Sequence, residues 1–257
     1  MGHSNLILIK LGGSVITFKE KPLAANFEAI RNISYTLASL KIPIILIHGG
    51  GSFGHYWSVK YNMHSKPDQY DSHGISIVHE SMMALNQIIV NSMIKVGMNP
   101  YTIMPSVFTY GHKPIIKKIK QLKSFVENSV IPITFGDVVY VENKMYSILS
   151  GDALMSILSR ILRPSKVIFT LNVDGIYKDT RKREIIKELK DTNSINFSKV
   201  IQDVTGGMRR KVTEALKISD TGIDVLMVNG LKPERIIAAI SCTDFEGTLV
   251  RGKRSSK

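Results

Sequence analysis

Short, continuous apolar runs recur along this chain, and glycine-rich turns and helical patterns follow them. Leu6–Leu11 ends in Gly12-Gly13-Ser14, Pro43–Ile47 is followed by a histidine and three glycines, and Val167–Leu171 is a third run of the same kind. Strands that are apolar on both sides belong in a parallel sheet covered by helices on both faces. The pattern therefore predicts an α/β fold with a mostly parallel sheet, in which ligands bind beyond the carboxyl ends of the strands.

The rest of the chain alternates in the same way. We expect further strands at Tyr101–Met104, Val130–Thr134 and Val225–Val228, a hairpin of Val138–Val141 with Lys144–Ile148, and an edge strand at Gly247–Val250. We expect helices over residues 24–40, 72–97, 114–127, 152–162, 208–222 and 231–240. Because no repeat or linker interrupts the pattern, we predict one continuous sandwich with two lobes, residues 1–163 and 164–257.

Composition narrows the class of protein. Of the 257 residues 44% are apolar, enough for a substantial core. No apolar run reaches the ~18 residues that a membrane helix needs, and the first run is too short for a secretory signal. A single cysteine, Cys242, excludes an internal disulfide framework. We therefore expect a cytoplasmic protein with no membrane partner.

Net charge is the one unusual bulk property, since 34 Lys and Arg against 21 Asp and Glu give +13. Such a charge fits a nucleic acid, an anionic lipid, an anionic small molecule or a solvated, lysine-rich surface. The basic residues gather at 113–123, 178–190 and 251–257. None of these stretches carries the interleaved aromatic residues of a protein that binds single strands. A nucleic-acid-binding module is thus an alternative only, and we expect no nucleic-acid partner.

Two glycine-rich loops follow the first two strands. Lys10-Leu11-Gly12-Gly13-Ser14 can offer backbone N–H groups, a hydroxyl and an ammonium to an anion, although a tight turn would also explain it. The stretch from His48 to His55 holds four glycines in six residues, more than a turn requires. We interpret it as a cradle for a multiply charged oxyanion, with His55 as a donor and His48 as a structural hydrogen-bonding residue. Neither loop has the Walker A or dinucleotide-binding pattern.

Three further motifs lie at strand ends or helix starts. Ser150 can cap a helix that Asp152 enters, where Asp152 either responds to the helix dipole or orients lysines. Residues 172–178 contain an Asp-Gly turn. Residues 203–211 place two arginines and a lysine at a helix start, which fits a bound anion because cations alone oppose the dipole there. Together the loops form two anion cradles with lysines between them, the layout that phosphoryl transfer requires.

These motifs resemble those of the amino acid kinase family over about residues 5–251. The family signals are Lys10-Leu11-Gly12-Gly13-Ser14, His48-Gly49-Gly50-Gly51, Val173-Asp174-Gly175-Ile176-Tyr177, and Thr205-Gly206-Gly207-Met208 with Lys211. Four motifs resemble the members that phosphorylate isopentenyl phosphate: Ser52-Phe53-Gly54-His55, Ser76-Ile77-Val78-His79, Gly136-Asp137-Val138 and Ser150-Gly151-Asp152.

The resemblance implies a three-layer αβα sandwich whose first lobe binds isopentenyl phosphate and whose second lobe binds ATP. The implied reaction is ATP-dependent phosphorylation of isopentenyl phosphate to isopentenyl diphosphate, a step of isoprenoid biosynthesis in an alternate mevalonate pathway. Mg²⁺ is expected to come with the nucleotide, without metal ligands from the protein. The family also suggests a homodimer.

The resemblance further implies roles for individual residues. Lys10 would bridge the transferring phosphoryl group, and Asp152 would organise Lys10 and Lys211. His55 would bind the acceptor phosphate, and Lys19 would stabilise the transition state. The implied nucleotide-binding residues are Lys10, Leu11, Gly12, Gly13, Ser14, Gly51, Asp174, Gly175, Tyr177, Gly207 and Lys211, with Lys217 near the phosphates. The implied acceptor-binding residues are Gly50, His55, Gly151 and Asp152.

Two departures from the family pattern concern contacts with the nucleotide. Asn172 stands where an acid is usual, and Thr180 stands where a proline is common. Lys21 is close enough to Lys19 for the transition-state assignment to shift between them. The nearest enzymatic alternative is a kinase for another small phosphate or for a phosphonate of the fosfomycin type, which shares the use of the second-loop histidine.

An isoprenoid tail needs an apolar wall beside a phosphate loop. Helix 72–97 offers a stripe that is either core or pocket, formed by Val78, Met82, Met83, Leu85 and Ile89. Met82 and Met83 are adjacent, so we expect their side chains to face different surroundings.

Overall fold

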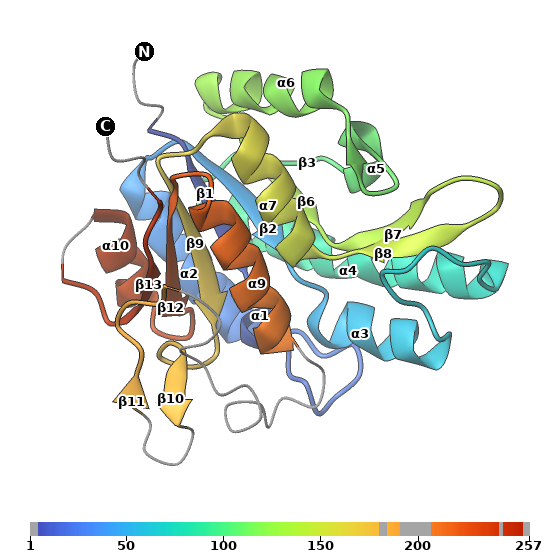
Figure 1. Cartoon of the computed structure of the whole chain (residues 1–257), viewed down its shortest axis with the longest axis horizontal. Coiled ribbons are helices and arrows are strands. Elements are labelled where there is room, and N and C mark those ends of the chain that lie inside the picture. The colour runs from blue at the N-terminus through green and yellow to red at the C-terminus, as the bar shows by residue number, and fades with distance from the viewer. Residues whose placement is uncertain (1–4, 180–183, 191–206, 242–243, 254–257) are drawn as a thin grey trace.

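The computed structural model describes residues 5–179, 184–190, 207–241 and 244–253. Thr180, Cys242, residues 203–206 of the last glycine motif and the end of the basic tail lie outside the described residues. Seven strands form one sheet in the order β13-β12-β9-β1-β2-β6-β3 (Figure 1). These strands are β1 (Ile7–Leu11), β2 (Ile44–His48), β3 (Pro100–Thr102), β6 (Ile131–Phe135), β9 (Lys166–Leu171), β12 (Asp224–Asn229) and β13 (Gly247–Val250).

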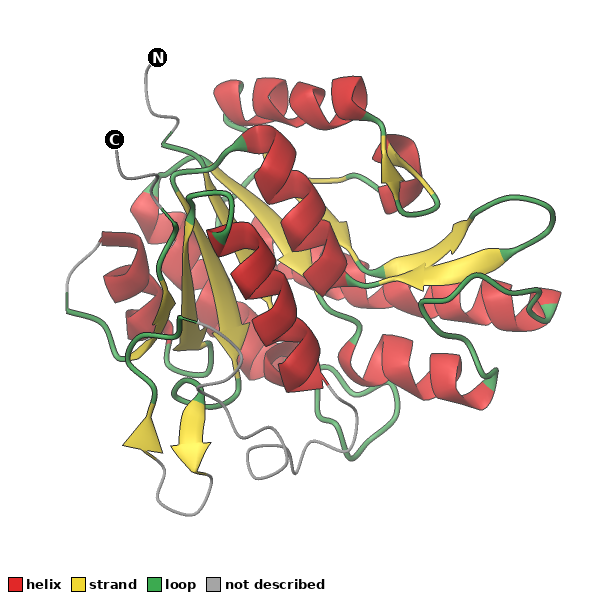
Figure 2. Cartoon of the chain, viewed as in Figure 1, coloured by secondary structure: helices red, strands yellow, loops and turns green. Residues whose placement is uncertain are grey.

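All neighbours in the sheet pair in parallel except β13, which pairs antiparallel with β12 at one edge. This confirms the predicted mostly parallel sheet and the predicted edge strand at Gly247–Val250. Helices cover both faces of the sheet, as Figure 2 shows, so the fold is the expected αβα sandwich.

The helices divide between the two faces according to the apolar core that each one enters. One core contains side chains of α6 (Ile116–Glu127), α7 (Gly151–Leu162) and α9 (Gly207–Ser219). The other contains side chains of α2 (Phe27–Leu40), α4 (Ser72–Lys95) and α10 (Pro233–Ser241). No helix in the described part of the chain has the length and apolarity to cross a membrane.

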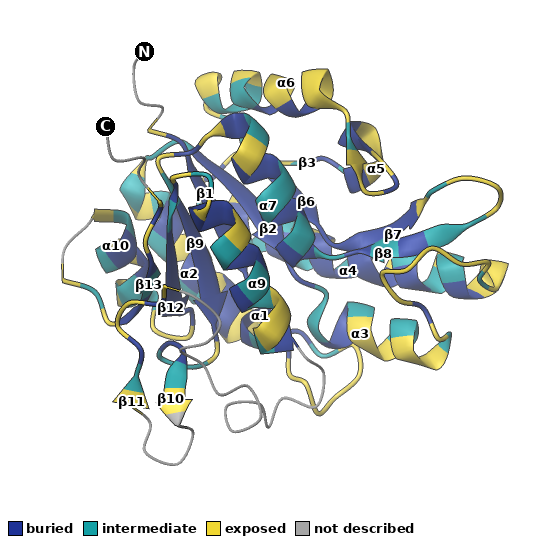
Figure 3. Cartoon of the chain, in the orientation of Figure 1, coloured by how far each residue is buried: buried dark blue, intermediate teal, exposed yellow. Residues whose placement is uncertain are grey.

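The central strands are buried along their whole length because each of their sides enters one of these cores (Figure 3). On β1, Leu8 packs in the core of α7 and α9, whereas the next residue, Ile9, packs in the core of α2 and α4. Alternation of side chains along a strand explains this division. It also explains why the sequence shows continuous apolar runs instead of an alternating pattern.

Polar caps fix where several helices begin. Asn26 accepts a hydrogen bond from the backbone of Ala29, so α2 begins at Phe27, three residues later than its predicted start. Ser150 accepts from the Ala153 backbone, which confirms the predicted cap of α7. Asp71 caps α4 in the same way.

Smaller elements surround the sheet. They are α1 (Gly13–Ile16), α3 (Gly51–Lys60), α5 (Pro105–Phe108), and the strand pairs β4 (Thr109–Tyr110) with β5 (Lys113–Pro114), β7 (Asp137–Tyr140) with β8 (Tyr146–Leu149), and β10 (Tyr177–Asp179) with β11 (Glu184–Ile185). The hairpin β7–β8 confirms the predicted pairing around residues 142–143.

Helix α3 differs from the prediction. We expected the glycine loop to extend to His55, but the chain is helical from Gly51 onward. Its sequence hides the helix, because Gly51 and Gly54 weaken helical propensity and its apolar residues form no regular stripe. As a result, Ser52 and His55 project from a helix and not from a loop.

Candidate active site

The site is built around β1, the middle strand of the sheet. The chain runs from β1 to β2 on one side, and β9 pairs with β1 on the other side. A position where the strand order reverses in this way is where parallel α/β sheets bind their ligands. Lys10, on β1, therefore lies where the two halves of the sheet meet, and its side chain is only 4% exposed.

The two glycine loops are packed backbone against backbone. A Cβ atom built on Gly13 would lie 2.4 Å from the backbone nitrogen of Gly51, and one on Gly49 would lie 2.9 Å from the nitrogen of Gly13. Gly51 itself has φ +49°, a conformation that favours glycine. These glycines allow the loops to approach each other more closely than residues with side chains could.

Thr17 joins the same two loops, a role that the sequence analysis missed. Its hydroxyl donates to the carbonyl of Gly13 at 2.7 Å and accepts from the backbone N–H of Ser52 at 2.9 Å. Thr170 acts similarly on the other side of Lys10, because its hydroxyl accepts from the Gly12 backbone and donates to the Lys10 carbonyl. For Thr170, the signal available in the sequence was a hydroxyl residue within a buried apolar strand.

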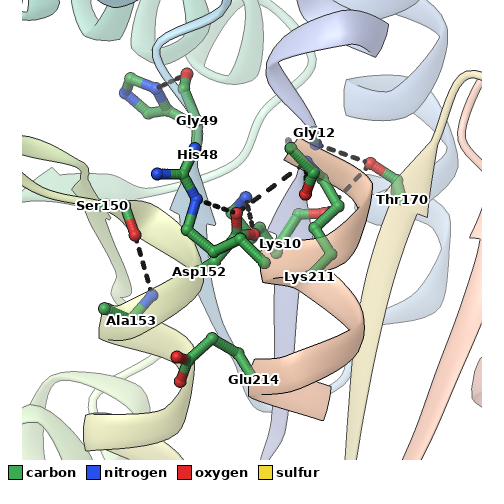
Figure 4. A network of polar contacts seen from close by, with 12 residues as sticks. Lys10, Gly12, His48, Gly49, Ser150, Asp152, Ala153, Thr170, Lys211 and Glu214 are labelled. Carbon is green, nitrogen blue, oxygen red and sulfur yellow. Dashed lines mark hydrogen bonds and ion pairs between the residues drawn. The ribbon is translucent and has the colours of Figure 1, made fainter. Parts of the chain in front are cut away.

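Asp152 collects the cations of the site. The Lys10 ammonium lies 2.5 Å from Oδ1 of Asp152, while Arg210 Nε and Lys211 Nζ lie 3.6 and 3.9 Å from its Oδ2. Figure 4 shows the side chains of Lys10 and Lys211 converging on Asp152 at the start of α7. Of the two explanations for Asp152, the orientation of lysines is therefore the one that its contacts support.

Charge balance at Asp152 favours its ionised form. Burial would raise the pKa of this carboxyl, but Lys10, Lys211 and Arg210 outweigh burial and hold the pKa below its ordinary value. The carboxylate also explains why a helix can begin with basic residues, since Arg210 and Lys211 face a negative group here. The cluster still carries more positive than negative charge, which suits the binding of an added anion.

Gly151 brings α7 against the first two strands. A Cβ atom on Gly151 would lie 2.9 Å from the carbonyl oxygen of His48 and 3.0 Å from Cε of Lys10. Gly50 is equally confined, since a Cβ there would meet the backbone of Gly54 and the sulfur of Met82. The structure thus brings Lys10, the two glycine loops and the start of α7 together.

Lys19 and His55 lie on a pocket beside these loops. The pocket has a volume of about 400 Å³ and is lined by Lys19, Glu20, Pro22, Ser52, His55, Tyr56, Val59 and Lys60. Both side chains are largely exposed. Of the neighbouring lysines 19 and 21, Lys19 is the one that lines this pocket.

The predicted nucleotide-binding residues Asp174, Gly175 and Tyr177 follow β9, which pairs with β1 on the side opposite β2. Ser14 donates to Asn172 at 3.1 Å, which gives the residue that departs from the family pattern a structural role. Asp174 accepts hydrogen bonds from Asn229 and Arg235. A Cβ on Gly175 would meet Ile185 and Thr248, so this turn is tightly packed. Tyr177 begins β10. Gly207 begins α9, and its carbonyl accepts a hydrogen bond from Lys211.

Lys217 stands at the other end of α9 from Gly207. It lies in the last turn of α9, about 15 Å along the helix axis from Gly207, and pairs with Glu214 at 2.7 Å. Its distance from the start of α9 gives the expected position of Lys217 near the nucleotide phosphates no support, and that role stays a prediction.

His48 is a structural residue, as its position at the strand end predicts. Its ring is buried, stacks on Phe135 and hydrogen-bonds the Gly49 carbonyl and Asn86. Burial lowers the pKa of His48 to about 4, so the ring is neutral near pH 7.

The apolar stripe of α4 is core for the most part. Val78, Met82, Leu85 and Ile89 are buried, whereas Met83 is 41% exposed. The two adjacent methionines thus face different surroundings, as predicted. The sulfur of Met82 packs against Gly50 and Gly54, so this stripe supports the second glycine loop from behind.

The fold and the site together define an α/β phosphotransferase. A sequence model described as "Amino acid kinase family" matches residues 5–229, and the chain belongs to this family. The isopentenyl phosphate kinase of Thermoplasma acidophilum is 33% identical over 96% of this chain and 100% of that protein. The isopentenyl phosphate kinase of Methanothermobacter thermautotrophicus is 29% identical over 96% and 100%. The crystal structure of the T. acidophilum enzyme as a product complex superposes with a TM-score of 0.79, at 30% identity over 96% of this chain and 100% of that chain.

Proposed function

We propose that this protein transfers the γ-phosphoryl group of ATP to isopentenyl phosphate. An oxygen of the acceptor phosphate forms a bond to the γ-phosphorus, and the bond from that phosphorus to the β,γ-bridging oxygen breaks. The products are isopentenyl diphosphate and ADP. The acceptor oxygen is already anionic near neutral pH, so the reaction requires no general base.

The observation that carries this proposal is the convergence of Lys10, Arg210 and Lys211 on Asp152 beside two glycine loops in backbone contact. Phosphoryl transfer requires two anions to meet in line, and fixed cations lower the cost of that approach. Asp152 holds the ammonium of Lys10 in place while the neighbouring basic residues keep the region positive. The names of the relatives at 33% and 29% identity supply the identity of the acceptor.

We assign the two anions to opposite sides of β1. ATP binds through Lys10, Leu11, Gly12, Gly13, Ser14, Gly51 and Lys211, with Asp174, Gly175, Tyr177 and Gly207 around the rest of the nucleotide. The acceptor phosphate binds through Gly50, His55, Gly151 and Asp152, with Lys19 close to the transferring group. In this assignment residues 1–163 form the acceptor lobe and also supply the first glycine loop and Gly51 to the ATP phosphates, whereas residues 164–257 form the lobe that holds the rest of ATP.

Magnesium accompanies ATP in this proposal. Within the described residues no group of three or more histidine, cysteine or carboxylate side chains is arranged to hold a metal ion. In this proposal the nucleotide phosphates supply its main ligands, and the bound ion would neutralise developing charge on the phosphate oxygens. A homodimer remains our prediction for the assembly.

A small apolar cluster provides a place for the isoprenoid tail. It lies where α3, α4 and the hairpin β7–β8 meet, apart from the two main cores, and contains Met63, Val78 and Val138 with Trp57, Tyr61, Tyr70, Ile75, Tyr146 and Ile148. Trp57 stands on the same helix as His55 and Tyr61 caps the C-terminal end of that helix, so an acceptor phosphate at His55 would have apolar surface within reach of a five-carbon chain.

The test is an assay of the purified protein with ATP, Mg²⁺ and either isopentenyl phosphate or fosfomycin, followed by ³¹P NMR. We expect a diphosphate signal with isopentenyl phosphate and much lower turnover of the phosphonate. No turnover of isopentenyl phosphate, under conditions where the phosphonate reacts, would replace the proposed acceptor by the phosphonate class.

A further inference from the structure

A half-buried histidine–carboxylate pair lies outside the cation cluster and has no place in the chemistry proposed above. His79 of α4 and Asp137 of β7 meet with 2.7 Å between Nδ1 and Oδ2. The carboxylate is 4% exposed and the imidazole 38% exposed. The other oxygen of Asp137 accepts from the Val138 backbone at 2.8 Å. A buried carboxylate is costly unless it is paired, and His79 is the side-chain partner that the described contacts give it.

On its α4 side, the pair is connected to the second glycine loop. Within one helical turn of His79, the Ser81 hydroxyl donates to the Phe53 carbonyl of α3 at 2.7 Å. In the same turn, the sulfur of Met82 fills the space in front of Gly50 and Gly54. Helix α4 therefore supports the elements that carry Gly50 and His55.

On its hairpin side, the pair is connected to the start of α7. The backbone N–H of Gly136, just before Asp137, donates to the His48 carbonyl at 3.2 Å. A Cβ on Gly136 would lie 2.7 Å from the backbone nitrogen of Gly151. The other end of the hairpin leads directly into this turn, since Asp137 pairs with Leu149. A shift of Asp137 would thus be transmitted to Gly151 and Asp152.

The pair also borders the small apolar cluster of α3, α4 and the hairpin. Val78 and Val138, which adjoin His79 and Asp137 in the sequence, are two of its three fully packed members. The separation between α4 and the hairpin fixes how much room this cluster leaves for a ligand.

We infer that His79 and Asp137 are positioning residues. They fix the distance between α4 and the β7–β8 hairpin, the two sides of the acceptor site, and so determine acceptor affinity. The inference rests on the proposed function only for the identity of the acceptor. Neither residue takes part in the bond changes; they act through Gly50, His55 and Gly151.

The test compares KM for the acceptor, KM for ATP and kcat in four variants. In His79→Ala we expect the acceptor KM to rise about tenfold or more, the size expected for loss of a charge-assisted hydrogen bond, while the ATP KM stays within about twofold. His79→Asn places an amide N–H near the position of Nδ1 and should recover most of the acceptor affinity. His112→Ala is the matched control, because it removes a histidine hydrogen bond of 2.9 Å to Ser147 of the same hairpin without a link to α4, and it should leave both KM values unchanged.

The fourth variant separates positioning from folding. His79→Ala can be unstable because it leaves a buried carboxylate unpaired. The double variant His79→Ala/Asp137→Asn removes that charge together with the hydrogen bond between α4 and the hairpin. It should therefore fold and still show the raised acceptor KM. An unchanged acceptor KM in this folded double variant, or an equal rise in both KM values, overturns the inference. If the wild-type protein uses the phosphonate instead of isopentenyl phosphate, the acceptor proposal fails, and the same comparison with the phosphonate still tests the positioning role.

Discussion

The ammonium of Lys10 lies 2.5 Å from Oδ1 of Asp152, although 142 positions of sequence separate the two residues. Strand β1 supplies the lysine, and the first turn of α7 supplies the carboxylate. Lys10→Ala should therefore remove a cation that the fold holds at the centre of the site. We expect kcat to fall by about a hundredfold to a thousandfold or more, because fixed charge is the main contribution to this reaction.

Lys211→Ala should have an effect on kcat of similar size, since Lys211 faces the same carboxylate. Lys253→Ala is the control, because Lys253 is an exposed lysine in an ion pair with Asp220, remote from the loops in sequence. Steady-state kinetics with saturating ATP and acceptor measures kcat for Lys10→Ala, Lys211→Ala and the Lys253→Ala control. A rate within about tenfold of wild type in either site variant would contradict the role of fixed charge.

Asp152→Asn should affect stability as well as rate. It leaves the buried ammonium of Lys10 without its counter-charge, and breaking a buried pair costs about 3–5 kcal/mol of the free energy of unfolding. Adding Lys10→Met to this variant should restore much of the stability and none of the activity. Urea denaturation of the single and double variants measures this, and equal stability of the two would show that the pair contributes little.

His55→Ala should separate the two substrates. The side chain stands on α3 in the pocket that Lys19 also lines. We expect the KM for the acceptor to rise far more than the KM for ATP, because the role we propose for the imidazole is to donate a hydrogen bond to the acceptor phosphate. His112→Ala, which removes a histidine bound to Ser147 and outside the proposed acceptor site, serves as the control. Equal losses for both substrates would mean that His55 is misassigned.

Gly13→Ala should abolish activity by separating the loops. The added methyl group would lie 2.4 Å from the Gly51 nitrogen, so the backbones must move apart. Gly97→Ala is a useful comparison, since it has φ +80° but no atom within 4 Å of the new methyl group. That variant should lose about 1 kcal/mol of stability through backbone strain and keep its kcat. Normal turnover by a folded Gly13→Ala protein would show that contact between the loops is unnecessary.

His48 should make the protein sensitive to acid. Burial lowers its pKa to about 4 from 6.5, so the unfolded chain takes up a proton more readily than the folded one. The stabilisation is present above pH 6.5 and is lost as the pH falls toward 4, by about 3 kcal/mol in total. His48→Gln should show a smaller loss over this range. Urea denaturation at pH 7 and pH 4.5 measures the difference, and identical pH dependence of the two proteins would contradict it.

Much of the architecture was predictable because it depends on patterns within short segments. Continuous apolar runs such as Leu6–Leu11 indicate strands covered on both sides, and the run at Gly247–Val250 stands at the edge as expected. Helix α3 was missed because its glycines and scattered aromatic residues give no regular apolar stripe. Its helical form depends on packing against α4, which the local sequence does not encode.

The site was predictable only in its residue types. Glycine-rich loops indicate anion binding, but the sequence could not show that Gly13 touches Gly51 or that Thr17 bridges their loops. The motifs that contain His79 and Asp137 were visible as motifs, yet their pairing depends on how α4 crosses the hairpin. The sequence also could not show that Lys217 stands in the last turn of α9, away from Gly207 at the start of that helix.

The close contact between Gly13 and Gly51 also limits how this enzyme could be redesigned. No residue with a side chain fits at that crossing, so the phosphate-holding loops offer almost no freedom for engineering a new acceptor preference. The positions to vary lie instead on α3, on α4 and on the β7–β8 hairpin, whose side chains form the small apolar cluster. Libraries for longer or bulkier acceptors should therefore vary Trp57, Ile75 and Ile148 and leave the glycines untouched.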